Sequence, residues 1–273
     1  MIRNIPDIRK NFTPLQPFAG QYGEGVCYNE LFPHHDLSGL IYCYWELKTI
    51  VPLKTLFQYK VVPDACTDIF FETENPGQLF VMGFSTGYTE FPLGYRFRYM
   101  GIRFLPSVFP LLFRVDGQEL AGKVTALGDV LPGIFKSLVQ YMPETASFTE
   151  YACFFDARFR EITTGLMPAI DGRFFNALDI ILRKRGGLRL QDELDTGISP
   201  RQLRRLFGFY MGSTPKAFSK VVRFQYGLQT GLARSVGEDP MFFYDAGYYD
   251  QSHFIREFRQ MYGCTPTDVM KEK

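Results

Sequence analysis

Arginine side chains near the start of one short predicted helix carry the clearest chemistry in the sequence. The helix is predicted to follow Ser199, a good N-cap residue, with Pro200 in its first position, and to reach Tyr210. Three arginines share one face of it: Arg201, Arg204 and Arg205. A stripe at helical spacing is apolar and predicted to be buried: Leu203, Leu206, Phe207 and Tyr210. Guanidinium groups placed in this way can bond guanine O6 and N7 in the major groove of DNA, or its phosphates, although a solvated basic face has the same pattern.

A second predicted helix repeats this arrangement 51 residues later. It follows Asp250, an N-cap candidate, and runs from Gln251 to Met261 with a stripe of Phe254, Phe258 and Met261 predicted to be buried. Its other side carries Gln251, Ser252, Ile255 and Arg256. Both helices end in a Gly-x-Thr-Pro segment, at 212–215 and 263–266, and aligning these segments places Arg205 against Arg256. A solvated face would not recur with the same stop signal, so the duplication indicates two helix-turn-helix units.

The segment between the two units predicts a connecting helix over residues 215–234. About 20 helical residues would span roughly 30 Å. Two units held that far apart could address successive major grooves on one face of B-DNA, which lie about 34 Å apart. We therefore expect double-stranded DNA to be the partner of this part of the chain.

The first half of the chain has a different pattern. Short apolar or alternating runs separated by Gly and Pro turns predict strands between about 40 and 104, notably 55–62, 68–71, 78–84, 88–91 and 94–104. Helices are predicted at 106–113, 131–142 and 148–163. The fold class is therefore α+β: an N-terminal antiparallel β barrel or sandwich with flanking helices, then an all-α domain of two helix-turn-helix units joined by a long helix.

The charge also divides between the two halves. The whole chain has a formal net charge of +1, which by itself argues against a strongly basic nucleic-acid binder. Residues 1–170 carry 14 basic and 17 acidic side chains, whereas residues 171–273 carry 16 basic and 12 acidic ones. The average therefore hides an acidic half and a basic half, and we place the domain boundary at 168/169.

Residues 171–270 resemble the DNA-binding domain of the AraC/XylS family of bacterial transcription regulators. The matching residues are Gly197, Ser199, Arg201, Leu203, Arg205, Phe207, Arg223, then Gly247-Tyr248-x-Asp250-Gln251-Ser252-His253-Phe254-x-Arg256-x-Phe258-Arg259, and Gly263-x-Thr265-Pro266. The first half is similar, more loosely, to the β-rich sensor domain of one branch of that family, through Val62-Pro63-Asp64-Ala65-Cys66-Thr67-Asp68, Gly101-Ile102-Arg103-Phe104-x-Pro106 and Leu127-Gly128-Asp129.

The resemblance implies a transcription regulator that is not an enzyme. Residues 1–168 would sense a small ligand or dimerise, and residues 169–273 would bind promoter DNA through units at about 188–211 and 240–262. Base-facing positions would be Arg201, Arg204, Arg205, Gln251, Ser252 and Arg256, and His253 would have a structural or phosphate-facing role. The implied partners are double-stranded promoter DNA, a small-molecule effector, RNA polymerase and a second copy in a homodimer, with no catalytic residue, metal or cofactor.

An alternative is a cupin-like β-barrel enzyme or ligand-binding protein with an accessory helical interaction domain. A metal-dependent enzyme would need His and carboxylate ligands on neighbouring strands. The three histidines are His34, His35 and His253, and the carboxylates of Asp64 and Asp68 are interpreted as turn and cap residues. A DNA-repair alkyl-transfer role would need a reactive cysteine, for which the isolated Cys66 gives little support.

The high aromatic content, 16% of residues, predicts large cores and an aromatic-lined pocket. Trp45, Tyr59 and Phe70 are candidates for this pocket, although plain β core explains them equally well. The amphipathic helices between 131 and 163 are candidates for a dimer interface. The first ten residues lack the apolar core of a signal peptide and the longest apolar stretch is too short to span a membrane, so we expect a cytoplasmic protein.

Overall fold

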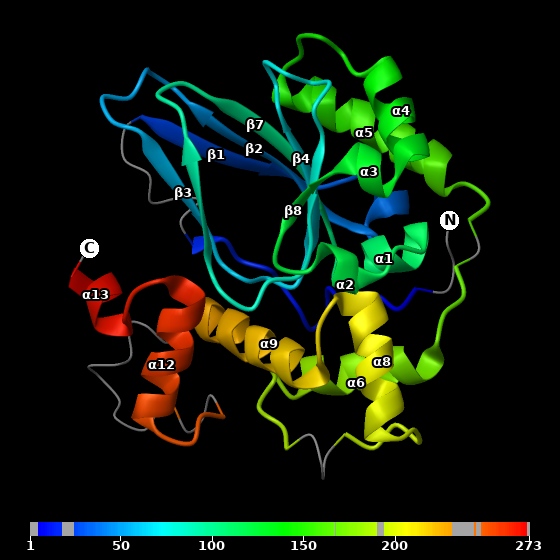
Figure 1. The fold of residues 1–273 in the computed structure, drawn as a ribbon, viewed down its shortest axis with the longest axis vertical. Coiled ribbons are helices and arrows are strands. Elements are labelled where there is room, and N and C mark those ends of the chain that lie inside the picture. Colours follow the sequence, from blue (N-terminus) through cyan, green and yellow to red (C-terminus); the bar gives the residue numbers. More distant parts are fainter. Residues whose placement is uncertain are drawn as a thin grey trace.

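Two antiparallel sheets form the N-terminal half of the chain (Figure 1). The computed structural model describes residues 5–17, 25–166, 168–189, 194–230, 243 and 247–271. The strands are β1 (Val26–Leu31), β2 (Ile41–Thr49), β3 (Phe57–Val61), β4 (Thr67–Glu72), β5 (Phe80–Met82), β6 (Thr89–Leu93), β7 (Arg98–Phe104) and β8 (Val124–Ala126). Six strands pair in the order β1-β2-β7-β4-β5-β8, and β3 pairs with β6 in a separate ribbon. The predicted antiparallel β-rich domain is confirmed, whereas β1 and β8 were not predicted, because β1 lacks a clean alternation and β8 has three residues.

Helices cover one face of the six-stranded sheet: α1 (Val108–Phe113), α2 (Gly117–Leu120), α3 (Leu127–Val130), α4 (Pro132–Tyr141) and α5 (Phe148–Thr163), with a 3-10 turn, η2, at His35–Leu37. The longest, α5, begins with a capping box in which Ser147 and Glu150 satisfy each other's backbone N–H groups. Its rings contact those of the sheet, with centroids 5.6 Å apart for Tyr151 and Phe71. This aromatic layer is the main core of the β-rich half.

The C-terminal half is helical. It contains α6 (Gly172–Arg183), α8 (Pro200–Met211), α9 (Pro215–Thr230), α12 (Gln251–Tyr262) and α13 (Pro266–Lys271). Helix α9 lies between α8 and α12 and contributes to the core around each (Figure 1). The ring of Phe218 on α9 lies 5.9 Å from that of Phe207 on α8, and Phe224 lies 5.8 Å from Phe258 on α12. The fold class is therefore α+β, as predicted.

Several expectations fall partly outside the described residues. The first parts of the two units predicted at about 188–211 and 240–262 are only partly described; Leu194 and Phe243 in them are buried. The predicted connecting helix 215–234 is described over α9, to Thr230. Among the described residues, none of the helices has both the length and the apolar composition that a bilayer span requires.

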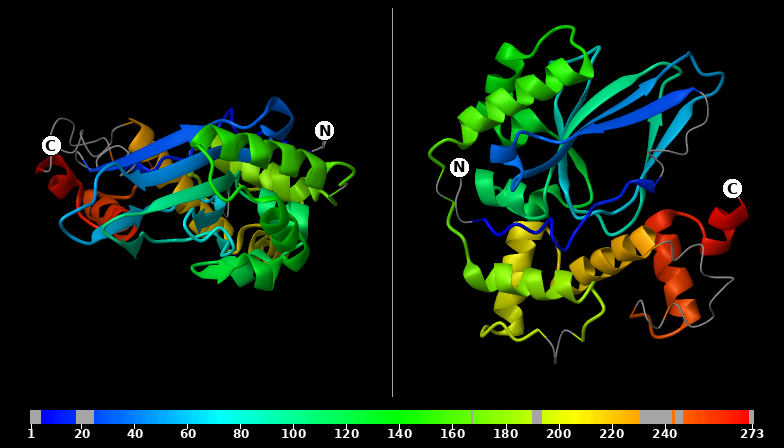
Figure 2. Two further views of the ribbon diagram at one scale, coloured as in Figure 1. Left: turned by 90° about the horizontal axis from the view of Figure 1, so that it is seen from above. Right: turned by 180° about the vertical axis from the view of Figure 1, so that it is seen from behind.

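The two halves of the chain pack directly against each other. Helix α2 lies so close to the end of α8 that a Cβ on Gly117 would be 2.5 Å from the backbone nitrogen of Gly212. Residues 5–17 run between the sheet and the helical part (Figure 2). There Gln229 of α9 donates a hydrogen bond to the carbonyl of Thr13 at 2.6 Å.

Candidate DNA-binding helices and an aromatic-lined cavity

Helix α8 displays its arginines at its N-terminal end. The Ser199 hydroxyl accepts a hydrogen bond from the backbone N–H of Gln202 at 3.3 Å, so the predicted N-cap is correct. Three side chains on its outer face are exposed and form no ion pair with any residue that the structure describes: Arg201, Arg204 and Arg205. Leu203, Phe207 and Tyr210 are buried as predicted, whereas Leu206 is only half-buried. The helix thus holds three unpaired cations on a rigid, well-packed support.

Helix α12 has the same construction. Its N-cap carboxylate, Asp250, accepts a hydrogen bond from the backbone N–H of His253 at 2.6 Å. The predicted base-facing residues are all exposed: Gln251, Ser252 and Arg256. Both helices end at a glycine with positive φ, +70° at Gly212 and +92° at Gly263, which is why each stop signal has a glycine.

A buried carboxylate joins α12 to α9. Glu257 is 4% exposed. It contacts the Lys220 ammonium and Arg223 Nη2 at 2.6 Å each and His253 Nε2 at 3.1 Å. Burial alone would raise its pKa, but the hydrogen bonds from Lys220 and Arg223 hold the pKa of Glu257 below its ordinary value. Arg223 Nη1 also donates to the Gly247 carbonyl at 2.9 Å, so one guanidinium fixes both the helix and the turn before it.

The role of Glu257 was not predicted from the sequence. A signal was present, because Glu257 directly precedes Phe258 of the buried stripe and follows His253 by one helical turn. An acidic residue on the buried side of a helix requires a cation nearby. Arg223, which carries part of the family resemblance, is that cation. His253 lies in the same cluster, in keeping with the expected structural role.

Both candidate recognition helices turn their C-terminal ends toward the β-rich half. The end of α8 packs on Gly117, and the carbonyl of Gln260 in α12 accepts a hydrogen bond from the backbone N–H of Tyr88 at 3.3 Å. The N-terminal end of α8, which carries the arginines, lies on the side away from the sheet (Figure 1). The two helices stand at opposite ends of α9, whose 16 residues span about 24 Å.

A cavity of about 340 Å³ lies between the six-stranded sheet and the β3–β6 ribbon. Trp45, Tyr59 and Phe70 line it, so the predicted aromatic-lined pocket is present. Most of the remaining wall is apolar, with a few polar side chains together: Leu47, Val61, Val62, Pro63, Asp64, Cys66, Asp68, Phe80, Met82, Gly83, Ser85, Phe91, Pro92, Leu93, Tyr99, Arg103 and Val124. An apolar hollow with convergent polar groups is typical of a small-molecule site.

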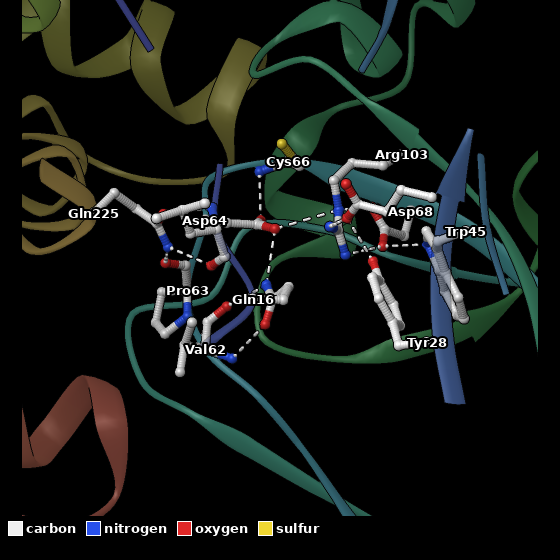
Figure 3. Close-up of polar contacts among 12 residues, drawn as sticks. Gln16, Tyr28, Trp45, Val62, Pro63, Asp64, Cys66, Asp68, Arg103 and Gln225 are labelled. Atoms are coloured by element: carbon white, nitrogen blue, oxygen red, sulfur yellow. Dashed lines mark hydrogen bonds and ion pairs between the residues drawn. The ribbon is translucent and has the colours of Figure 1, made fainter. Parts of the chain in front are cut away.

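An ion-pair cluster forms the polar wall of this cavity (Figure 3). The register of β4 against β7 places Asp68 opposite Arg103. Arg103 Nη2 lies 3.0 Å from Asp68 Oδ2, and Arg103 Nε lies 3.3 Å from Asp64 Oδ2. Burial raises the pKa of Asp68 to about 6, even though the Arg103 guanidinium lowers it. Both aspartates were interpreted from the sequence as turn and cap residues. For Asp68 this is wrong, because it lies within β4 and pairs with Arg103. Asp64 does accept a hydrogen bond from the Cys66 backbone N–H, as a turn residue does.

Trp45 is held across the sheet by a glycine and a carboxylate. A Cβ on Gly101 would lie 2.0 Å from the indole, so only glycine leaves room for the ring over β7. The indole Nε1 donates to Asp68 Oδ2 at 3.0 Å. The aromatic wall and the ion-pair cluster are thus one connected unit.

Hydrogen bonds connect this cluster to α9 (Figure 3). The Gln16 amide donates to Asp64 Oδ2 and to the Val62 carbonyl, at 2.9 Å each. The fully buried Gln225 of α9 donates to the Pro63 carbonyl at 2.7 Å and accepts from the Leu15 N–H at 2.7 Å. The cavity wall and α9, the helix between the two candidate recognition helices, are therefore joined by buried hydrogen bonds.

The other candidate sites have different surroundings. Burial raises the pKa of the Cys66 thiol well above its ordinary value, which keeps it protonated and weakly nucleophilic. The structure brings His34, His35 and Asp36 together on η2, outside the cavity. Asp36 is already paired with Arg160 Nε at 3.3 Å, and no histidine is among the described residues that line the cavity.

Two family models match the chain. A helix-turn-helix domain matches residues 195–272, and a domain of unknown function (DUF6597) matches residues 29–126. No curated protein sequence matches significantly. Among solved structures, ToxT from Vibrio cholerae O395 is 10% identical, with a TM-score of 0.41 over 81% of this chain and 95% of that one. Unsaturated fatty acid-bound wild-type ToxT from Vibrio cholerae strain SCE256 is 13% identical, with a TM-score of 0.42 over 91% and 95%. At these sequence identities and TM-scores, we infer nothing about the ligand or the oligomeric state of this chain from ToxT.

The helix-turn-helix match covers α8, α9 and α12, the elements that carry the exposed arginines and the duplicated caps. The C-terminal part is thus a helix-turn-helix DNA-binding domain of the AraC type. The chain is therefore a DNA-binding transcription regulator.

Proposed function

We propose that α8 and α12 read successive major grooves of promoter DNA, α8 through Arg201, Arg204 and Arg205, and α12 through Gln251, Ser252 and Arg256. The observation that carries this proposal is that the same arrangement occurs at both ends of α9. Each end has an N-capped helix with a buried apolar stripe and exposed polar side chains. In α8 the arginines lie on the side away from the β-rich half, where a duplex has access. Such a regulator would act in the cytoplasm, where bacterial promoters lie.

The β-rich half is proposed to sense a small-molecule effector in its cavity. Gln16 of the N-terminal segment bonds Asp64, while Gln225 of α9 bonds the neighbouring Pro63 carbonyl and the Leu15 N–H. A ligand that displaces Asp64 would therefore disturb the segments that contact α9. Effector binding would then change the affinity for DNA, and DNA would change the affinity for effector by the same factor.

The DNA-reading role is tested by substituting the arginines. The full chain is first used to select its DNA site from a random library. Arg204→Ala or Arg205→Ala should then weaken binding to that site by about 1–3 kcal/mol where the arginine is bidentate to a base. Arg183→Ala, which removes an exposed arginine of α6 that pairs with Asp179, serves as the matched control. Unchanged affinity for both α8 variants would refute the assignment.

Two further partners are proposed: a second copy of the chain, which would bind through α4 and α5, and RNA polymerase. Helix α4 supports a dimer interface, because Ile134, Phe135 and Val139 are only partly buried and Tyr141 is 56% exposed. The mass in solution at micromolar concentration tests this part: a dimer supports the interface, and a monomer contradicts it.

A further inference from the structure

We propose that the cavity binds a small organic cation, a protonated or quaternary amine with an apolar body. This inference rests on the effector role proposed above and adds the chemical class of the effector. The cavity volume of about 340 Å³ lies at the lower end of the usual range for ligand sites, so the ligand is small.

The first argument is the excess of carboxylates at the polar wall. Three acidic side chains surround the single Arg103 guanidinium. Its Nε and Nη2 face Asp64 and Asp68, and its Nη1, which has no hydrogen bond with a described residue, faces Glu30 Oε1 at 3.7 Å. The cluster is therefore net negative whenever these groups are ionised, and a cation would compensate it.

The second argument is that the carboxylates of the cluster are more exposed than its guanidinium. The Arg103 side chain is 2% exposed, whereas those of Asp64 and Asp68 are 11% and 17% exposed. Both aspartates line the cavity and have acceptor capacity beyond the hydrogen bonds they accept. Carboxylate oxygens are thus more accessible to a ligand in the cavity than the guanidinium is, which favours a cation over an anion.

The third argument is the aromatic wall beside these carboxylates. Trp45 and Phe70 have ring centroids 6.4 Å apart, and Phe70 and Phe91 lie 6.5 Å apart, all three along the cavity. Tyr59 lines the same space. Faces of aromatic rings attract cations, most strongly where water is excluded. Carboxylates and aromatic rings around one apolar hollow are together the surroundings that a desolvated amine requires.

Trp45 is the only tryptophan in the sequence, so its emission reports on the cavity in the full chain. The chain would be titrated with benzyltrimethylammonium, with its neutral carbon isostere neopentylbenzene, and with the anion 4-phenylbutanoate. The cation is expected to bind saturably, at least about tenfold more tightly than either comparator, because it gains a charged contact. Asp68→Asn should weaken cation binding about tenfold and leave the neutral compound unaffected.

Two further variants keep the test decisive if Asp68→Asn folds poorly. Phe91→Leu keeps the apolar contact and removes a π face, so cation affinity should fall about three- to tenfold while neutral affinity holds. Asp179→Asn, on exposed α6, should change nothing. Any of three results would overturn the proposal. The anion or the neutral compound could bind more tightly than the cation, or the cation could bind both cavity variants as tightly as the wild type. The third is binding that does not saturate by about 10 mM cation.

The effector role is tested separately from the ligand class, by measuring DNA binding with and without the cation. Saturable cation binding that leaves DNA affinity unchanged would support the ligand class and contradict the effector role. Loss of DNA binding in Arg205→Ala with the cation titration unchanged would show that Arg205 acts at the DNA and not through the cavity. Absence of cation binding would overturn the ligand class alone, because DNA reading by α8 is measured without it.

Discussion

Glu257→Gln removes the charge through which α12, the second candidate recognition helix, is paired with α9. The carboxylate is 5% exposed and contacts Lys220 and Arg223 at 2.6 Å each. Removing one partner of a buried ion pair costs about 3–5 kcal/mol. Lys220 is 34% exposed and can return to water, whereas Arg223 is 11% exposed and remains without its counter-charge. We therefore expect a loss of about 3 kcal/mol, the lower end of that range.

The loss is measured by urea unfolding of the full chain, together with a chemical footprint on the selected DNA site. Protection by α12 should be lost, while protection by α8 remains, because Glu257 supports only the second unit. Glu144→Gln, at an exposed position, is the control. An unchanged unfolding free energy and a complete footprint for Glu257→Gln would refute the account of this contact.

The same residue gives a pH dependence with a definite sign. Burial acts to raise the pKa of Glu257, but the bonds from Lys220 and Arg223 lower it overall below its ordinary 4.5. A carboxylate with a lowered pKa in the folded state stabilises the fold above its unfolded pKa, and this contribution is lost as the pH falls through the folded pKa. The difference in unfolding free energy between wild type and Glu257→Gln should therefore shrink below about pH 4.5. A constant difference would contradict the ion-pair assignment.

Three further predictions concern the cavity and the contact between the halves. Gly101→Ala should displace the Trp45 indole, red-shift its emission and destabilise the fold by about 1–3 kcal/mol, whereas Gly77→Ala, where a Cβ meets nothing, should do neither. Gly117→Ala should push α2 away from α8, lower the melting temperature and change the affinity for DNA; an unchanged melting temperature would count against the close contact. Gln225→Leu should leave cavity ligands bound, measured by Trp45 emission, but abolish their effect on DNA affinity; a retained effect would show that coupling takes another route.

The recognition helices could be predicted from the sequence because their determinants are local. Ser199 and Asp250 are N-caps within the segment they cap, and the buried stripes follow from helical spacing alone. The duplicated Gly-x-Thr-Pro segments added a second, independent signal. Helix α5 was predicted over its observed bounds from its amphipathic pattern, which is also local, and the structure adds the capping box at Ser147 and Glu150.

The polar wall of the cavity could not be predicted, because it depends on strand register between distant segments. Asp68 faces Arg103 across β4 and β7, 35 residues apart, and a shift of one residue would turn either side chain to the other face of the sheet. The link from Gln225 to Leu15 joins positions 210 residues apart. No local pattern marks Gln225, a buried amide within an amphipathic helix, as a contact to the N-terminal segment.

A footprint of the full chain on its selected DNA site tests the central claim most directly. The structure predicts two protected stretches of major groove on one face of the duplex, centred about one helical turn apart. Arg204→Ala and Arg205→Ala should weaken protection of one stretch, and Arg256→Ala should weaken protection of the other. A single protected stretch, or the same loss in both stretches from either set of variants, would contradict reading by two separate helices.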